Sequence, residues 1–93
     1  MSINNHILNY YEQMVAEEIL SRIAKVKPNA SVDFMADVAC VALNKLPPRY
    51  IRHKVDMAFY MSPDELIQTR QRVTEAVTDA LAFVAHHHRV EES

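Results

Sequence analysis

The stretch ALNKLPPRYI, residues 42–51, marks the sharpest change of structure expected along this chain of 93 residues. Its first residues are good helix formers. A proline, however, lacks the amide hydrogen that a helix needs and pushes the residue before it out of helical geometry. Pro47 and Pro48 therefore predict that a helix ends near Lys45. Arg49 and Tyr50 follow at once, so the sequence places a cation and an aromatic ring at a rigid corner.

The composition predicts an all-α protein. The chain contains no glycine, the residue that tight hairpin turns prefer, and this absence also excludes a glycine-rich phosphate loop. A chain of this length forms one domain with a thin core. Since 49% of the residues are hydrophobic, we expect a twofold homodimer to cover part of the apolar surface. The predicted fold is a small single domain, residues 1–93, of three to four helices with a long C-terminal helix and a frayed tail at 88–93.

Charge and cysteine content restrict the class of protein. The net charge of −2 argues against a general nucleic-acid binder, so no direct DNA binding is expected. Cys40 is the only cysteine, which leaves no disulfide framework and no thiolate zinc cluster within one chain and suits a reducing cytoplasm. No apolar run approaches the roughly 18 residues of a membrane span. We therefore expect a cytoplasmic protein with neither signal peptide nor membrane anchor.

Apolar residues at spacings of three and four predict the first two helices. The first is expected over residues 5–25 and ends before the turn signal VKPNAS, residues 26–31. Ser31 and Asp33 are both suitable N-caps for the second. The apolar positions of the second helix are so numerous that we expect it to be buried on most sides.

The last third of the sequence begins with an ambiguous segment and continues with a clear helix start. Residues 51–60 show no regular period, so we predict an irregular or short extended segment. MSPDEL, residues 61–66, combines Ser62 as N-cap, Pro63 at the first helical position and Glu65 in a capping box. The long helix that starts here is predicted to continue to about His87.

Several residue types associated with catalysis have ordinary explanations in this sequence. His86, His87 and His88 are consecutive, so on a helix they point about 100° apart and do not converge on one metal ion. Cys40 lies among apolar residues and is expected to be a small buried hydrophobe rather than a nucleophile. No nucleophile, base and orienting group occur together at usable spacing. We expect no enzyme activity and no cofactor.

A basic cluster follows the prolines. Guanidinium groups bind phosphate bidentately and stack on bases, and a phenol ring stacks on any base. The prolines would hold such a loop rigid for a ligand. The alternative is a solvated basic turn that pairs with acids of the first helix. The cluster comprises Lys45, Arg49, Arg52, His53 and Lys54, with Tyr50 among them.

Asp37 is the other polar residue that needs an explanation. It lies in the middle of the apolar second helix, where a buried carboxylate would need a partner. An ion pair with Lys45 or Arg49 and a contact to a ligand both satisfy this need. The two interpretations stay open at this stage.

DVACVALNKLPPRYI, residues 37–51, resembles the signature of the ComFB family, named for a late competence development protein. The match includes the uninterrupted octapeptide LNKLPPRY, residues 43–50, and extends more weakly over nearly the whole chain. The resemblance implies a small helical homodimer and a receptor for cyclic di-GMP or cyclic di-AMP. Some family members carry a cysteine-ligated zinc before the motif. NASVDFMA, residues 29–36, has no cysteine, so no zinc is expected here.

The resemblance and the basic cluster together give a site hypothesis. A cyclic dinucleotide is a dianion with two stackable purines, so its receptor needs a few firmly held cations beside flat groups. We expect Arg49, with Lys45 or Arg52, to contact phosphate and Tyr50 to stack on a base. Asn44 or Asp37 would contact a base edge or orient Arg49. All of these except Arg52 lie within the matched motif.

Two alternatives remain open. The motif residues Asn44, Pro47, Pro48 and Tyr50 serve equally well as a helix stop and its packing. In that case the protein is a dimeric adaptor that binds no nucleotide and docks a partner through the segment DMAFYM, residues 56–61. Either function requires an unidentified downstream protein. The sequence names neither that protein nor the preferred dinucleotide.

Overall fold

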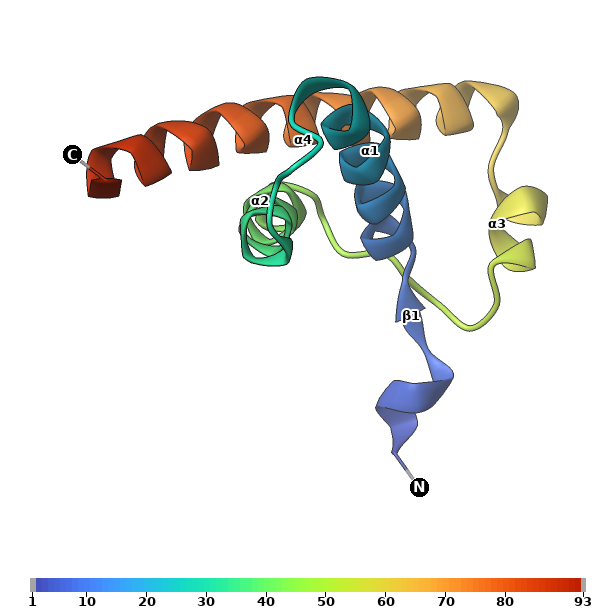
Figure 1. The fold of residues 1–93 in the computed structure, drawn as a ribbon. Coiled ribbons are helices and arrows are strands. Elements are labelled where there is room, and N and C mark those ends of the chain that lie inside the picture. The colour runs from blue at the N-terminus through green and yellow to red at the C-terminus, as the bar shows by residue number, and fades with distance from the viewer. Residues whose placement is uncertain (1, 93) are drawn as a thin grey trace.

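The computed structural model describes residues 2–92, without the side chains of residues 58, 59 and 88–92. In this part of the chain α4 spans the molecule, and α1 and α2 pack on one side of it (Figure 1). The prediction of an all-α domain with a long C-terminal helix is confirmed, with one small two-stranded ladder added. The elements are η1 (Ile3–His6), β1 (Leu8–Asn9), α1 (Tyr10–Val26), α2 (Val32–Asn44), β2 (Tyr50–Ile51), α3 (Val55–Tyr60) and α4 (Pro63–Glu92).

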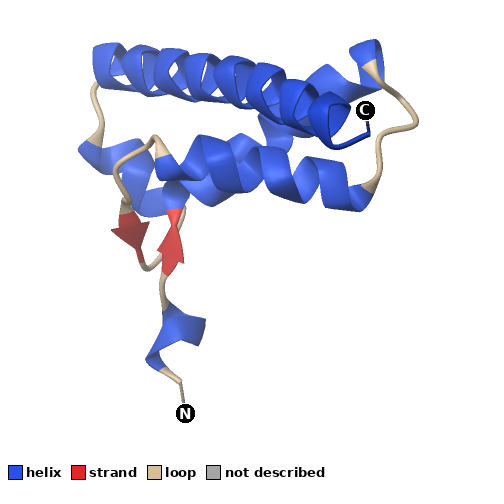
Figure 2. Cartoon of the chain, turned by 90° about the vertical axis from the view of Figure 1, so that its left-hand side faces the viewer, coloured by secondary structure: helices blue, strands red, loops and turns tan. Residues whose placement is uncertain are grey.

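The chain enters α1 later than predicted. Asn9, not a residue near Asn5, is the N-cap, and its side-chain oxygen accepts a hydrogen bond from the Tyr11 amide at 3.2 Å. The preceding residues form β1, which pairs antiparallel with β2 through Leu8 opposite Ile51 and Asn9 opposite Tyr50. Figure 2 shows the two strands side by side below the helices. This pairing with distant residues prevents the helix from extending toward the N-terminus.

α2 starts and ends where the sequence predicted. Ser31 is its N-cap and accepts a hydrogen bond from the Phe34 amide at 3.0 Å. The prediction that α2 is buried on most sides is wrong, because a single face carries its buried residues and Asp37 and Cys40 are exposed. The expectation that Cys40 is buried is therefore also wrong. The helix packs through one face only, so its remaining apolar residues are partly exposed to solvent.

The segment between α2 and α4 is partly helical. An irregular or short extended segment was predicted for residues 51–60. Ile51 does belong to the strand β2, but residues 55–60 form the short helix α3, so the prediction is wrong there. α4 begins as predicted, with the Ser62 hydroxyl accepting a hydrogen bond from the Glu65 amide at 3.2 Å. It continues past His87 to Glu92. The predicted frayed tail overlaps residues that the structure describes only in part, so it stays a prediction.

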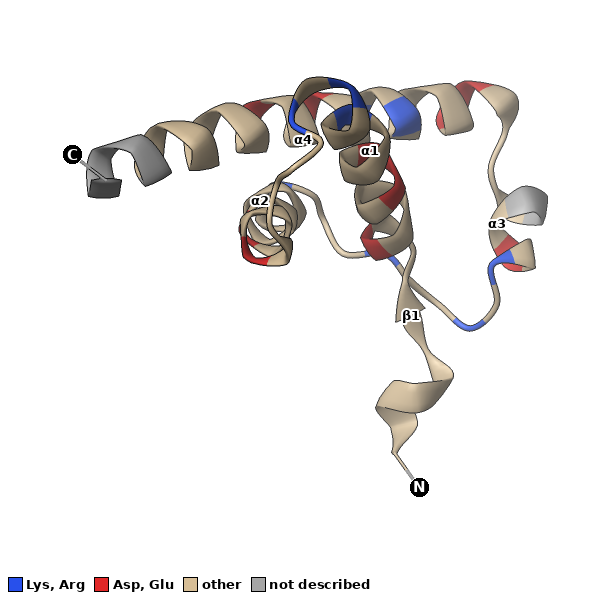
Figure 3. Ribbon diagram, in the orientation of Figure 1, with Lys and Arg blue, Asp and Glu red and all other residues tan. Residues whose placement is uncertain are grey.

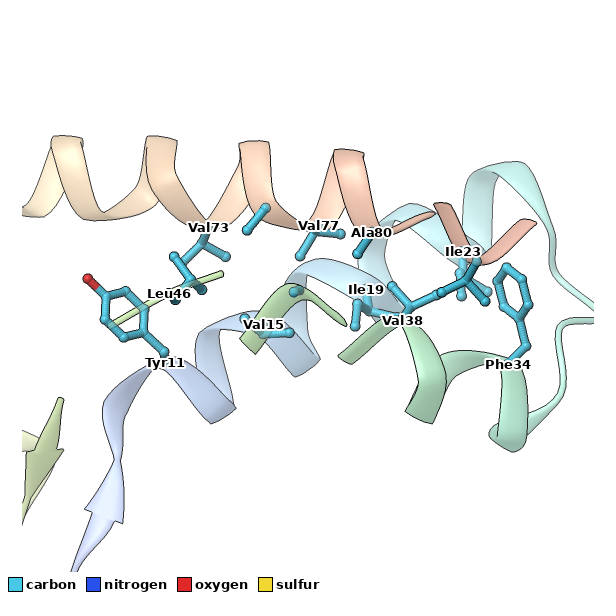
Figure 4. Close-up of a cluster of buried hydrophobic side chains, with 13 residues drawn as sticks. Tyr11, Val15, Ile19, Ile23, Phe34, Val38, Leu46, Val73, Val77 and Ala80 are labelled. Atoms are coloured by element: carbon cyan, nitrogen blue, oxygen red, sulfur yellow. The ribbon is translucent and has the colours of Figure 1, made fainter. Parts of the chain in front are cut away.

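One buried face of each of the three longest helices forms the core. Val15, Val38 and Val77, one from each helix, are fully buried where the helices meet. Tyr11 and Leu46 close one end of this core and Phe34 the other (Figure 4). The complete set is Tyr11, Val15, Ile19, Ile23, Phe34, Val38, Ala42, Leu46, Val73, Ala76, Val77, Ala80 and Val84.

The length of α4 gives the molecule an extended shape. Its 30 residues correspond to a rod of about 45 Å at 1.5 Å per residue, close to the longest dimension of 48 Å. The radius of gyration is 14.8 Å, above the roughly 12 Å of a compact chain of this length. The helix therefore reaches beyond the helices that it packs against.

Candidate functional site

The proline corner, residues 46–49, is fixed to the core through its first residue. α2 ends in a tightened turn in which the Lys45 amide bonds to the Ala42 carbonyl at 3.1 Å and the Leu46 amide to the Leu43 carbonyl at 3.2 Å. The Leu46 side chain then turns into the core and keeps 7% of its surface exposed. The two prolines that follow are exposed. Leu46 thus anchors the corner while the next residues lie along the surface.

Asn9 holds the other end of the corner. Its side-chain oxygen, which caps α1, also accepts a hydrogen bond from the Arg49 amide at 3.0 Å. The Arg49 carbonyl in turn accepts one from the Tyr10 amide at 2.8 Å. Both backbone polar groups of Arg49 are therefore bound to the start of α1. This arrangement fixes the position from which the Arg49 guanidinium extends.

Arg49 lines a small cavity, which we call the arginine pocket, between the start of α1, α3 and the first turns of α4. Its volume is about 180 Å³. A second arginine, Arg72 on α4, lines the same cavity, and the one acid among its lining residues is Glu65. The wall therefore carries a net positive charge. The remaining lining residues are Tyr10, Tyr11, Met57, Met61, Gln68 and Thr69.

A second, more open hollow adjoins the proline corner. This corner hollow has a volume of about 470 Å³, and Arg72 lines it as well as the arginine pocket. Lys45 and Asp79 face each other across it at 3.9 Å. Its lining residues include two cations, Arg72 and Lys45, and two anions, Asp79 and Glu75, so they carry no net charge. The other walls are Leu46, Pro47 and Ala76.

The structure brings together some of the predicted site residues and not others. Arg49 lines the arginine pocket, and Lys45 lines the corner hollow. Arg72 lines both. Basic positions follow one another along the chain from α2 to α3 (Figure 3). Arg52 and Tyr50 line neither of the two hollows, and Tyr50 on β2 keeps 63% of its surface exposed.

The two predicted residues on α2 are exposed. Asn44 is the last residue of the helix and lines neither hollow. Asp37 is exposed rather than buried, so burial is no reason for it to need a partner. Lys45, one of the two cations considered for it, forms its ion pair with Asp79 of α4.

Arg72 is the residue that sequence reasoning missed. Its neighbours in the sequence, QTRQRVTEAV, have the mixed polar pattern of a solvated helix face. A weak signal existed, because Glu65, Arg72 and Asp79 recur every seven residues and so share one face of α4. The sequence could not show that this face lies against the proline corner.

Two further structural results concern metal ions and membranes. In the described residues, no group of three or more histidine, cysteine, aspartate or glutamate side chains is placed to hold a metal ion. The side chain of His88 lies outside the description, so the expectation for the three consecutive histidines stays a prediction. None of the helices within the described range is long and apolar enough to cross a membrane.

The described part of the chain is a small helical domain with a basic corner, held at both ends, beside two hollows. Comparison with protein families then identifies it more closely. The family model described as late competence development protein ComFB matches residues 8–88. The match covers most of the chain, which therefore belongs to the ComFB family. No curated protein matches the chain.

Proposed function

We propose that this protein is a cytoplasmic receptor for a cyclic dinucleotide, cyclic di-GMP or cyclic di-AMP, that catalyses no reaction. The single observation that carries the proposal is that Arg49 and Arg72 line one pocket beside two tyrosines, Tyr10 and Tyr11. Guanidinium groups bind phosphate through paired, charge-assisted hydrogen bonds. Family membership supports the same ligand class, because the resemblance implied it.

The ligand extends over both hollows in this proposal. Small-molecule sites commonly have volumes of about 300–1,000 Å³, so the arginine pocket, at about 180 Å³, holds only part of a cyclic dinucleotide. One phosphate lies between Arg49 and Arg72, and the other lies toward Lys45 in the corner hollow. Lys45 must then leave Asp79, and an exposed ion pair of this kind contributes only about 0–1 kcal/mol.

The remaining predicted residues act on the bases, the phosphates or Arg49. Tyr50 is an exposed aromatic ring next to Arg49 in the chain and stacks on a base that projects from the pocket. Arg52 adds a cation two residues further on. Asn44 and Asp37 lie exposed on α2, where one or the other contacts a base edge or orients Arg49.

A calorimetric titration of paired arginine variants tests the proposal. Arg72→Gln should weaken cyclic dinucleotide binding by about ten- to hundredfold, because a hydrogen bond to a charged group contributes about 1.5–3 kcal/mol. Arg70→Gln is the matched control. Arg70 lines a different hollow with Ile67 and Thr74, since two residues rotate a helix by about 200°. It should leave affinity within about twofold of the unchanged protein.

Arg49→Lys adds a test of geometry, since it keeps the charge and loses the two-pronged donor. Its affinity for the cyclic dinucleotide should lie between that of the unchanged protein and that of Arg72→Gln. If neither dinucleotide binds the unchanged protein, or if both Arg70→Gln and Arg72→Gln weaken binding equally, the receptor proposal is wrong.

The adaptor function is the second candidate, and one observation favours it. Tyr60 at the end of α3 keeps 75% of its surface exposed, whereas Met57 and Met61 of the same segment are buried. A partner would therefore meet Tyr60 rather than the methionines. The side chain of Phe59 lies outside the description. Capture of a partner that survives Arg49→Ala and is lost on Tyr60→Ala would favour the adaptor.

The proposed receptor is a twofold homodimer. Large apolar side chains remain exposed on several helices, among them Leu20 on α1 and Ile67 and Phe83 on α4. Since α4 also reaches beyond its own domain, a second copy of the chain provides the natural cover for this surface. A twofold dimer also matches the symmetry of a cyclic dinucleotide with two identical halves.

A further inference from the structure

A third hollow lies away from the proline corner, where α1 ends, α2 begins and α4 passes both. Its volume is about 270 Å³. The walls are mostly apolar, and Ile23 and Phe34 lie together at this end of the core (Figure 4). We call it the apolar hollow. Its lining residues are Arg22, Ile23, Val26, Lys27, Phe34, Leu81, Ala82 and Ala85.

The hollow exists because α4 presents small side chains here. Ala82 and Ala85 leave space that larger residues would fill. Val26 stands at the end of α1 with 82% of its surface exposed. An apolar cavity of about 150 Å³ is known to bind benzene, so this hollow has room for one aromatic ring or branched aliphatic side chain. It falls short of the usual volume of a small-molecule site.

Two cations line the apolar hollow. The Lys27 ammonium lies 4.3 Å from the centre of the Phe34 ring, a cation–π contact. The Arg22 guanidinium is held by the Thr78 hydroxyl at 2.7 Å and lies 3.7 Å from the Glu18 carboxylate. Lys25 adds a third cation in the last turn of α1. Figure 3 shows basic positions gathered at this end of α1, next to α4.

We propose that the apolar hollow is the docking site of a partner protein that inserts one aromatic or aliphatic side chain flanked by carboxylates. The size of the hollow selects a single apolar anchor, as in the central pockets of protein interfaces. The cations Lys27, Arg22 and Lys25 select acidic neighbours of that anchor. The proposal stands whether or not the protein binds a cyclic dinucleotide, because no residue of the proposed ligand site lines this hollow.

The concave shape favours a protein over a membrane surface. A lipid surface binds proteins through apolar side chains that project into the acyl region, together with nearby cations. Here Val26 projects, but Ile23, Phe34 and Leu81 line a hollow that a flat bilayer cannot enter. An anchor side chain on a peptide fills the same hollow and removes this area from water.

Fluorescence anisotropy with a synthetic peptide tests the docking site on the whole protein. The probe is a fluorescein-labelled decapeptide with a central Leu-Phe pair and glutamates on both sides. We expect saturable binding to the unchanged protein. A peptide with two alanines in place of the Leu-Phe pair should bind at least about tenfold more weakly, since a buried anchor contributes about 1.5–3 kcal/mol.

Charge and volume variants then locate the binding. Lys27→Glu should weaken binding by about tenfold or more through repulsion of the acidic peptide. Lys54→Glu makes the same charge change at an exposed position before α3 and should change affinity by less than about twofold. Ala82→Trp places a ring against the hollow and should also weaken binding, with an unchanged circular dichroism spectrum showing that the protein still folds.

Four results would overturn the proposal. The first is that the Leu-Phe peptide does not bind at about 1 mM, and the second is that the alanine peptide binds equally well. The third is that Lys27→Glu and Lys54→Glu weaken peptide binding equally. The fourth is that the protein binds vesicles of anionic phospholipid but not the peptide. Self-association that Lys27→Glu abolishes would assign the hollow to a second copy of this chain and would equally reject a foreign partner.

Discussion

Asn9 is the residue on which the geometry of the proposed ligand site most depends. A single side-chain oxygen accepts hydrogen bonds from the Tyr11 and Arg49 amides. The first bond starts α1, and the second fixes the proline corner beside it. One residue thus couples a helix start to a loop 40 positions further along the chain.

Asn9→Ala should lower the free energy of unfolding by about 1–2 kcal/mol, because loss of an N-cap costs about 0.5–2 kcal/mol and the Arg49 amide also loses its acceptor. For a domain of this size the thermal midpoint should fall by about 5–10 °C. Thermal unfolding followed by circular dichroism provides the measurement. Asn5→Ala, at an exposed position in η1, is the control and should change stability by less than about 0.5 kcal/mol. Equal effects of the two substitutions would show that the Asn9 contacts contribute little.

The elements of this fold divide into those that local sequence determines and those that distant contacts determine. Pro47 and Pro48 end α2, and Ser62 starts α4, through effects that act within a few residues. The start of α1 differs, because Ile7 and Leu8 fit the apolar stripe of a helix. Leu8 instead pairs with Ile51, which no local pattern reveals.

The same distinction explains which residues of the candidate site the sequence predicted. Arg49 stood out because it follows two prolines. Arg72 did not stand out in the sequence, because it joins the candidate site only through the face of α4 that lies against the proline corner. α3 is only six residues long, too short for a helical period to show. Sequence patterns therefore predicted the helices and the corner, while tertiary packing selected the second arginine.

Ser62→Ala tests how far the start of α4 depends on its cap. The Ser62 hydroxyl accepts a hydrogen bond from the Glu65 amide, so its loss should cost about 1 kcal/mol and speed hydrogen exchange in the first turn of α4. Ser21→Ala, at an exposed position inside α1, should instead stabilise slightly, because alanine is the better helix former there. Unchanged exchange at the amides of residues 64–66 in Ser62→Ala would mean that packing, not the cap, holds this turn.

At the scale of the whole molecule, the long helix α4 packs on a small hydrophobic core. The three fully buried valines lie where three helices meet, whereas Leu20, Ile67 and Phe83 lie exposed on the outside. A chain of 93 residues buries only somewhat more than about 60% of the surface that it exposes when unfolded. Covering the outer apolar residues with a second chain would add to the stability of this small domain.

The proposed homodimer therefore predicts that stability depends on protein concentration. Because dimerisation stabilises only the folded chain, the thermal midpoint should rise as the concentration increases. Sedimentation equilibrium should give about twice the mass of 10.7 kDa. Leu20→Glu, at the exposed position on α1, should lower the mass to that of one chain if this residue lies in the interface. Val32→Glu, also exposed but at the start of α2, is the matched control for the added charge. A single-chain mass at every concentration, with a constant midpoint, would reject the dimer and leave α4 as an overhanging helix exposed to solvent.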